Sequence, residues 1–114
     1  MELNEYQNQT KNYLNYPPEL GPFYNCIAIQ MAVGQLSEKI ENLISDPNAK
    51  IDQDYALKLG ISLGDIMGYV SNLASDVGMS LEEICAINLR KLNMARKKAE
   101  AEQNQKVIKY EKDK

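Results

Sequence analysis

The chain has 114 residues with a formal net charge of -3; 44% of the residues are hydrophobic and 25% are charged, values that suit one globular domain. The acidic balance argues against a dedicated nucleic-acid-binding protein, which usually presents a basic face. The absence of histidine, together with the presence of only two cysteines, excludes a Cys/His zinc site, a histidine-based catalytic triad and a disulfide scaffold.

Two further features bear on location and on the core. Cys26 and Cys85 lie in apolar surroundings, and we expect both to be small buried core residues. No apolar run approaches the length needed to span a bilayer, so we expect no membrane contact. Because the polar N-terminus lacks the basic and apolar regions of a signal peptide, the sequence predicts a cytoplasmic location.

The first predicted element is a short, largely polar helix over about residues 4–16. Pro17 ends it, because proline lacks a backbone N–H donor and restricts the residue before it. A long helix follows over about residues 23–45, where apolar residues recur at alternating spacings of four and three and therefore share one face. These residues are Ile29, Val33, Leu36, Ile40 and Leu43.

The third predicted helix covers about residues 52–77 and repeats the same spacing. Gly78 is a natural C-terminal cap for it, because glycine adopts a left-handed backbone at little cost. The fourth helix begins at Ser80, which forms a capping-box pattern with Glu83. We expect it to continue past Arg96 into the charged C-terminal segment. The apolar stripe of the third helix comprises Leu59, Leu63, Ile66, Val70, Leu73 and Val77.

No segment shows the alternation typical of a strand, so the predicted fold is an all-α bundle with three long helices and one short N-terminal helix. Short loops make neighbouring long helices antiparallel. We divide the chain into a helical domain, residues 1–95, and a charged segment, residues 96–114, which is either a helical extension or a frayed tail. The two central helices are apolar over wider faces than one small bundle can cover, and we expect dimerisation to complete the core.

Asp65 is a lone carboxylate within an apolar helical run, and burial of such a group is costly unless it is paired or coordinates an ion. Polar residues spaced by three and four form a stripe on each of the two central helices. Facing stripes suit either a Mg²⁺ site that uses Glu38 and Asp65, or a polar layer that hydrogen-bonds to Asp65. The stripes comprise Gln35, Glu38 and Asn42 on the second helix and Ser62, Asp65, Tyr69 and Asn72 on the third.

Four segments in consecutive order resemble parts of the MazG-like nucleoside triphosphate pyrophosphohydrolases. They are Leu3–Gln7 with Tyr16-Pro17 downstream, Ala32–Ile40, Leu63–Tyr69, and Gly78–Ile84 followed by Asn88 and Lys91-Leu92. The resemblance implies an all-α bundle that assembles as dimers or tetramers. It also implies the family reaction, in which a nucleoside triphosphate is split into a monophosphate and pyrophosphate while Mg²⁺ polarises the phosphates and activates water.

The resemblance places the family's metal ligands in a Glu-x-x-Glu pair on one helix and a Glu-x-x-Asp pair on the next. This chain carries Ala32, Gln35 and Ser62 at three of these four positions, and only Asp65 remains acidic. Glu38 matches an additional glutamate that is common one turn further along the first of these helices.

Three other positions match the family's ligand-contacting residues. By resemblance, Asn88 and Lys91 correspond to residues that contact phosphate, and Tyr69 to an aromatic residue near the nucleotide. The resemblance therefore implies a nucleoside triphosphate as the ligand, and the acidic charge balance predicts no nucleic-acid partner.

The sequence leaves three functions open. In the first, the MazG-like fold persists while catalysis is lost or much reduced, because too few carboxylates remain to draw Mg²⁺ from its water shell. In the second, the chain is a divergent but active Mg²⁺-dependent pyrophosphohydrolase in which Glu38 and Asp65 hold the ion and Lys91 binds phosphate. The third, a helical adaptor unrelated to the family, predicts that Asp65 faces solvent.

Overall fold

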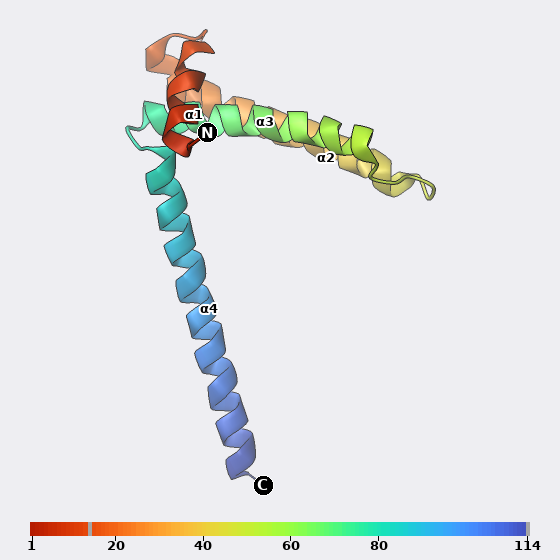
Figure 1. Cartoon of the computed structure of the whole chain (residues 1–114), viewed down its shortest axis with the longest axis vertical. Helices are drawn as coiled ribbons and strands as arrows, with labels where there is room; N and C mark the ends of the chain where they lie inside the picture. The colour runs from red at the N-terminus through yellow and green to blue at the C-terminus, as the bar shows by residue number, and fades with distance from the viewer. Residues whose placement is uncertain (14, 114) are drawn as a thin grey trace. The chain divides into compact units, whose positions relative to one another are not determined.

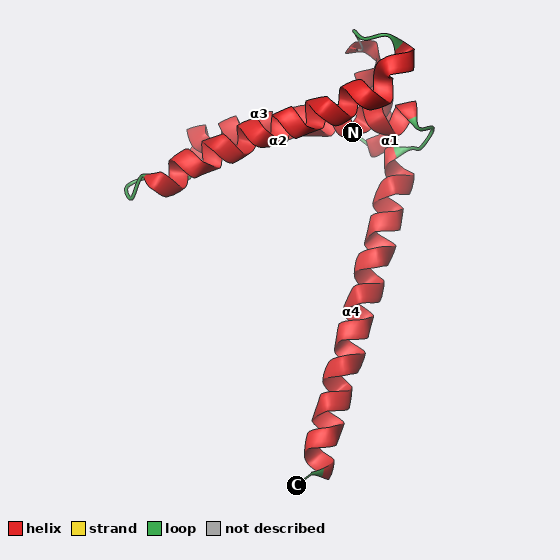
Figure 2. Ribbon diagram, turned by 180° about the vertical axis from the view of Figure 1, so that it is seen from behind, coloured by secondary structure: helices red, strands yellow, loops and turns green. Residues whose placement is uncertain are grey.

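The computed structural model describes residues 1–13 and 15–113. None of these residues forms a strand, which confirms the predicted all-α class and the order of one short helix and three long ones (Figures 1 and 2). No helix within the described residues combines the length and the apolar character that crossing a membrane requires. The helices are α1 (Leu3–Thr10), α2 (Gly21–Ser45), α3 (Gln53–Asp76) and α4 (Leu81–Lys112), with 3-10 turns η1 (Lys11–Tyr13) and η2 (Pro18–Leu20).

The chain forms two compact units, Met1–Leu81 and Glu82–Lys114. In the first unit α2 and α3 lie side by side as a long helical hairpin (Figure 1). The loop between them is short, so the two helices are antiparallel, as the sequence predicts. Helix α1 packs against α3.

The ends of α3 follow the signals in the sequence. Asp52 is the N-cap, and its side-chain oxygen accepts a hydrogen bond of 2.8 Å from the backbone N–H of Tyr55. At the other end, Gly78 has a φ of 76°, in the left-handed region that glycine tolerates. The N–H of Met79 then reaches back to the carbonyl of Ala74 at 2.9 Å. The predicted glycine cap is therefore confirmed.

The first helix ends earlier than the sequence predicts. Helix α1 stops at Thr10 and tightens into η1, so the predicted continuation to residue 16 is wrong; residue 14 of that prediction lies outside the described residues. The hydroxyl of Thr10 donates to the carbonyl of Gln7 at 2.9 Å and hydrogen-bonds the hydroxyl of Ser71 at 2.8 Å. The end of α1 is thus tied to α3 by a contact between distant parts of the chain, which no local signal encodes.

Gln7 joins α1 to the start of α4. Its Nε2 donates to Ser75 Oγ at 3.1 Å and to the carbonyl of Met79 at 2.9 Å, and its Oε1 accepts from the N–H of Leu81 at 2.9 Å. Gln7 is 6% exposed and Leu81 is 2% exposed. A side chain from the first helix therefore satisfies one of the backbone donors that a helix start leaves without a partner.

The interior of the first unit contains few large apolar side chains. Ala32 and Ala74 are buried, whereas the large hydrophobic residues of the stripes stay partly or largely exposed. Cys26 and Cys85 are both exposed, so the expectation of two buried cysteines is wrong for the single chain. The reason is that the helix faces carrying these residues have no covering element within the described residues of their own unit.

The second unit consists of α4. The helix crosses residue 95 without interruption and continues to Lys112, so the described part of the charged segment is a helical extension; residue 114 lies outside the described residues. An ion pair of 3.7 Å joins Arg96 to Glu100, but both side chains are largely exposed. Such surface pairs contribute little to stability.

Candidate functional site

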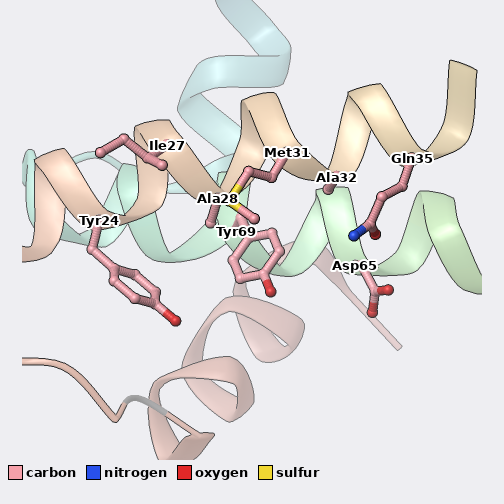
Figure 3. A pocket seen from close by; sticks show the side chains of 8 residues that line it. All are labelled: Tyr24, Ile27, Ala28, Met31, Ala32, Gln35, Asp65 and Tyr69. Carbon is pink, nitrogen blue, oxygen red and sulfur yellow. The ribbon is translucent and has the colours of Figure 1, made fainter.

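A cleft of about 260 Å³ opens along α2 and α3 beside Asp65, and we refer to it as the Asp65 cleft (Figure 3). Figure 3 shows the Asp65 carboxylate, the Gln35 amide and the Tyr69 ring projecting to the same side of the hairpin. The spacing of four between Asp65 and Tyr69 places both on one face of α3. The described lining residues are Tyr24, Ile27, Ala28, Met31, Ala32 and Gln35 from α2 and Asp65 and Tyr69 from α3.

The cleft brings together three of the four residues that, by the resemblance given above, correspond to metal ligands of the MazG-like family. Ala32 and Gln35 stand on α2 across from Asp65 on α3, and all three line the cleft. Tyr69 lies in the same wall as Asp65. The two polar stripes therefore meet near these residues.

Ser62, at the fourth position, belongs to a different contact. It is 6% exposed and does not line the Asp65 cleft. Its Oγ accepts a hydrogen bond of 2.5 Å from the ammonium group of Lys39, and the backbone carbonyl of Lys39 accepts one from the Tyr55 hydroxyl. The side chain of Lys39 on α2 thus reaches across the hairpin to Ser62 on α3, which by resemblance corresponds to an acidic residue of the MazG-like family.

The other predicted site residues lie elsewhere. Glu38 is exposed on α2, one turn beyond Gln35, and is not among the residues that line the cleft. Asn88 and Lys91 are exposed residues of α4 and belong to the second compact unit. The described structure therefore does not group Glu38 with Asp65 in one cleft.

Asp65 is exposed rather than buried, so the desolvation cost expected from its apolar neighbours in the sequence does not arise. Its carboxylate has no hydrogen bond or ion pair with any described residue, so the predicted polar layer around it is not present. The exposure of Asp65 agrees with the interpretation of the chain as a helical adaptor unrelated to the MazG-like family. Asp65 nevertheless lines a defined cleft.

The donor set of the cleft does not fit the magnesium cage of the MazG-like family. Asp65 is the only carboxylate among its described lining residues, and Gln35 offers one neutral oxygen. Among the described residues, no group of three or more histidine, cysteine, aspartate or glutamate side chains could hold a metal ion. Mg²⁺ demands near-octahedral oxygen coordination and gives up its waters reluctantly, so one carboxylate and one amide bind it weakly.

A buried polar cluster holds Tyr24 in the wall of the cleft. Asn25 is fully buried, and its Nδ2 donates to the Tyr16 hydroxyl and to the Asp76 carboxylate, both at 2.7 Å. The Tyr16 ring stacks on Tyr24 with centroids 4.6 Å apart. Burial raises the pKa of the Tyr16 hydroxyl, the hydrogen bond from Asn25 lowers it, and the negative charge of Asp76 raises it further.

Sequence reasoning missed the apolar half of this site. Tyr24, Ala28, Met31 and Gln35 recur at spacings of four, three and four, with Ile27 beside them, so they form a second stripe beside the core stripe of α2. That spacing was the signal available for this wall of the cleft. Lys39 was also missed, because a lysine within a helix is usually a surface residue.

Comparison with known proteins adds one relative. The chain is 29% identical over 72 residues to "Gene 37 protein" of Mycobacterium phage L5. The match covers 63% of each protein, so the chain spans less than two thirds of the length of this relative. No family model matches the chain. No solved structure matches it.

Proposed function

We propose that this chain is a MazG-like protein in which nucleoside triphosphate pyrophosphohydrolase activity is lost or much reduced. The observation that carries the proposal is the Asp65 cleft, in which Ala32 and Gln35 stand opposite Asp65 at positions where the family has acids. The all-α hairpin and the order of the resembling segments support the family assignment. The loss of three acids supports the loss of catalysis.

The charge around the cleft supports this proposal. Attraction by several carboxylates is what offsets the cost of stripping water from Mg²⁺, and a single carboxylate supplies only a small part of it. The ammonium group of Lys39 lies beside Ser62 at 2.5 Å from its hydroxyl oxygen, and it adds a positive charge where the family has a negative one. Both changes weaken the binding of a divalent cation.

We also propose that the protein is a homodimer, or a tetramer built from dimers, in the cytoplasm. Val33 is 43% exposed and Leu63 is 51% exposed, and they belong to the apolar stripes of α2 and α3. Residues two positions apart on a helix point to opposite sides, so these stripes lie away from Gln35 and Asp65. A second copy seated on this face would cover the stripes and leave the Asp65 cleft open.

The size of this face suits a dimer. Helix α2 has 25 residues, which at 1.5 Å per residue corresponds to a length of about 37 Å. Two adjacent helices about 10 Å wide then present roughly 700 Å² per chain, close to the roughly 800 Å² per partner of stable protein interfaces. Burial of the same area also removes the exposed apolar stripes from water.

The test of catalysis is pyrophosphate release from a panel of nucleoside triphosphates in the presence of Mg²⁺ or Mn²⁺. The expected rate is equal to or only slightly above the rate without protein, and Asp65→Ala changes it little. Turnover that is abolished by both Asp65→Ala and Glu38→Ala, but retained by the neighbouring control Glu41→Ala, would overturn the proposal in favour of an active, divergent enzyme.

The test of assembly is sedimentation equilibrium. Leu63→Glu places a charge within the apolar stripe and is expected to convert dimers to monomers. Leu57→Glu is the matched control, because Leu57 is also exposed on α3, at 65%, but lies outside the stripe. A wild-type monomer, or equal dissociation by both variants, contradicts the proposed interface.

A further inference from the structure

The Asp65 cleft has the chemistry of a site for an organic cation. Its carboxylate has no partner among the described residues, and no lysine or arginine is among the described lining residues. The ammonium group of Lys39 on α2 is directed to Ser62, which does not line the cleft. Residues 1–81 contain ten acidic and four basic side chains, a net charge of -6, so the field of the whole first unit also favours a cation.

Two tyrosine side chains line the same cleft as this carboxylate. Tyr24 and Tyr69 line the same cleft, and Figure 3 shows their rings on the side of the hairpin to which the Asp65 carboxylate projects. Stacking of Tyr16 on Tyr24 fixes one of the two rings before any ligand binds. Aromatic faces attract ammonium and guanidinium groups, and the thioether and alkyl side chains nearby favour a cation with an apolar stem.

A second cleft adjoins the first and shares Asp65 and Tyr69 with it. Its volume is about 220 Å³, and Asn72 is among its lining residues. The side-chain oxygen of Asn72 is buried and accepts no hydrogen bond in the described structure. The second cleft therefore offers a ligand at Asp65 additional room beside α3.

We propose that the Asp65 cleft binds an organic cation with N–H donors, an alkylammonium or guanidinium group whose charge pairs with Asp65 and whose stem packs between Tyr24 and Tyr69. The same group could belong to a free small amine or to a lysine or arginine side chain of another protein. This cation site does not depend on the proposed family, since the cleft would bind the cation whether or not the chain descends from pyrophosphohydrolases.

The experiment is a calorimetric titration of the full chain with 1,4-diaminobutane and, in parallel, with butane-1,4-diol, which has the same shape but no charge. Binding of the diamine and at least about a tenfold weaker interaction with the diol are expected, a difference of about 1.4 kcal/mol. N-acetyl-lysine-N-methylamide forms the second arm. Tighter binding of the lysine derivative than of n-butylamine, which carries the same single charge, identifies a protein side chain as the source, and the reverse order identifies a free amine.

Two variants separate a specific site from general attraction to an acidic protein. Asp65→Asn keeps the shape of the side chain and is expected to weaken diamine binding about tenfold or more. Asp54→Asn removes the same charge from the first turn of α3, outside both clefts, and is expected to leave the affinity within about twofold. Tyr69→Leu should weaken binding without changing the net charge.

Three results would overturn the proposal: no heat of binding for either cation, equal binding of the diol and the diamine, or equal losses in Asp65→Asn and Asp54→Asn. Because Asp65 is exposed, its substitution is expected to leave the helical circular dichroism spectrum unchanged. Failure of this titration leaves the proposal on lost catalysis standing, and pyrophosphate release would overturn that proposal alone.

Discussion

Replacement of Gln7 by alanine should destabilise the first unit more than any other single change on α1. The substitution removes three hydrogen bonds, to Ser75 Oγ, to the Met79 carbonyl and to the Leu81 N–H. Of these partners, Leu81 is only 2% exposed, so its N–H would be left unpaired away from water. An orphaned buried donor or acceptor costs about 1–3 kcal/mol, so the loss of the set should cost about 3 kcal/mol.

The assay is urea unfolding followed by circular dichroism, with all variants at one protein concentration because association shifts apparent stability. Gln9→Ala is the matched control, since Gln9 is an exposed glutamine on the same helix. It should change the free energy of unfolding by no more than about 0.5 kcal/mol. Equal unfolding curves for Gln7→Ala and Gln9→Ala would show that the hydrogen bonds of Gln7 to Ser75, Met79 and Leu81 contribute nothing.

Two further predictions concern packing and pH. Gly21→Ala should destabilise by about 1–3 kcal/mol, because an added Cβ would lie 2.5 Å from the Asp76 carboxylate. Gly60→Ala, which meets no atom within 4 Å, should stabilise by about 1 kcal/mol. A raised urea midpoint for Gly21→Ala would contradict the first prediction, and a lowered midpoint for Gly60→Ala would contradict the second. The raised pKa of Tyr16 means that the folded state binds the hydroxyl proton more tightly than the unfolded state does. The contribution of this proton to the free energy of unfolding is therefore complete below pH 10, and it is lost as the pH rises through the raised pKa. Thermal melts at increasing alkaline pH should therefore show a steeper loss of stability for wild type than for Tyr16→Phe, and parallel losses would refute the assignment.

The helices were predictable because their signals are local. The spacing of Val33 with its neighbours on α2 and of Leu63 with its neighbours on α3 specified two amphipathic helices, and Gly78 specified the end of the second. The end of α1 was not predictable, because the Thr10 hydroxyl bonds to Ser71, which is 61 positions away. Such contacts form only when the helices pack.

The candidate site was predictable in part. Two polar stripes correctly brought Gln35 to the same cleft as Asp65, because helical spacing fixes which residues share a face. The sequence did not decide whether Asp65 is buried, since a pattern of apolar residues does not reveal which helix faces remain uncovered in one chain. The contact of Lys39 with Ser62 also escaped prediction, because the flexible stem of lysine can carry its charge across a helix pair.

The measurement that decides between a degenerate and a working metal site is calorimetric titration of Mg²⁺ into wild type and into the double variant Ala32→Glu/Gln35→Glu. Both substituted residues line the Asp65 cleft, so the variant would place three carboxylates there and leave the contact between Lys39 and Ser62 intact. We predict no measurable heat for wild type and saturable binding for the variant. Tight binding of Mg²⁺ by wild type, abolished by Asp65→Asn, would contradict the account of a lost metal site.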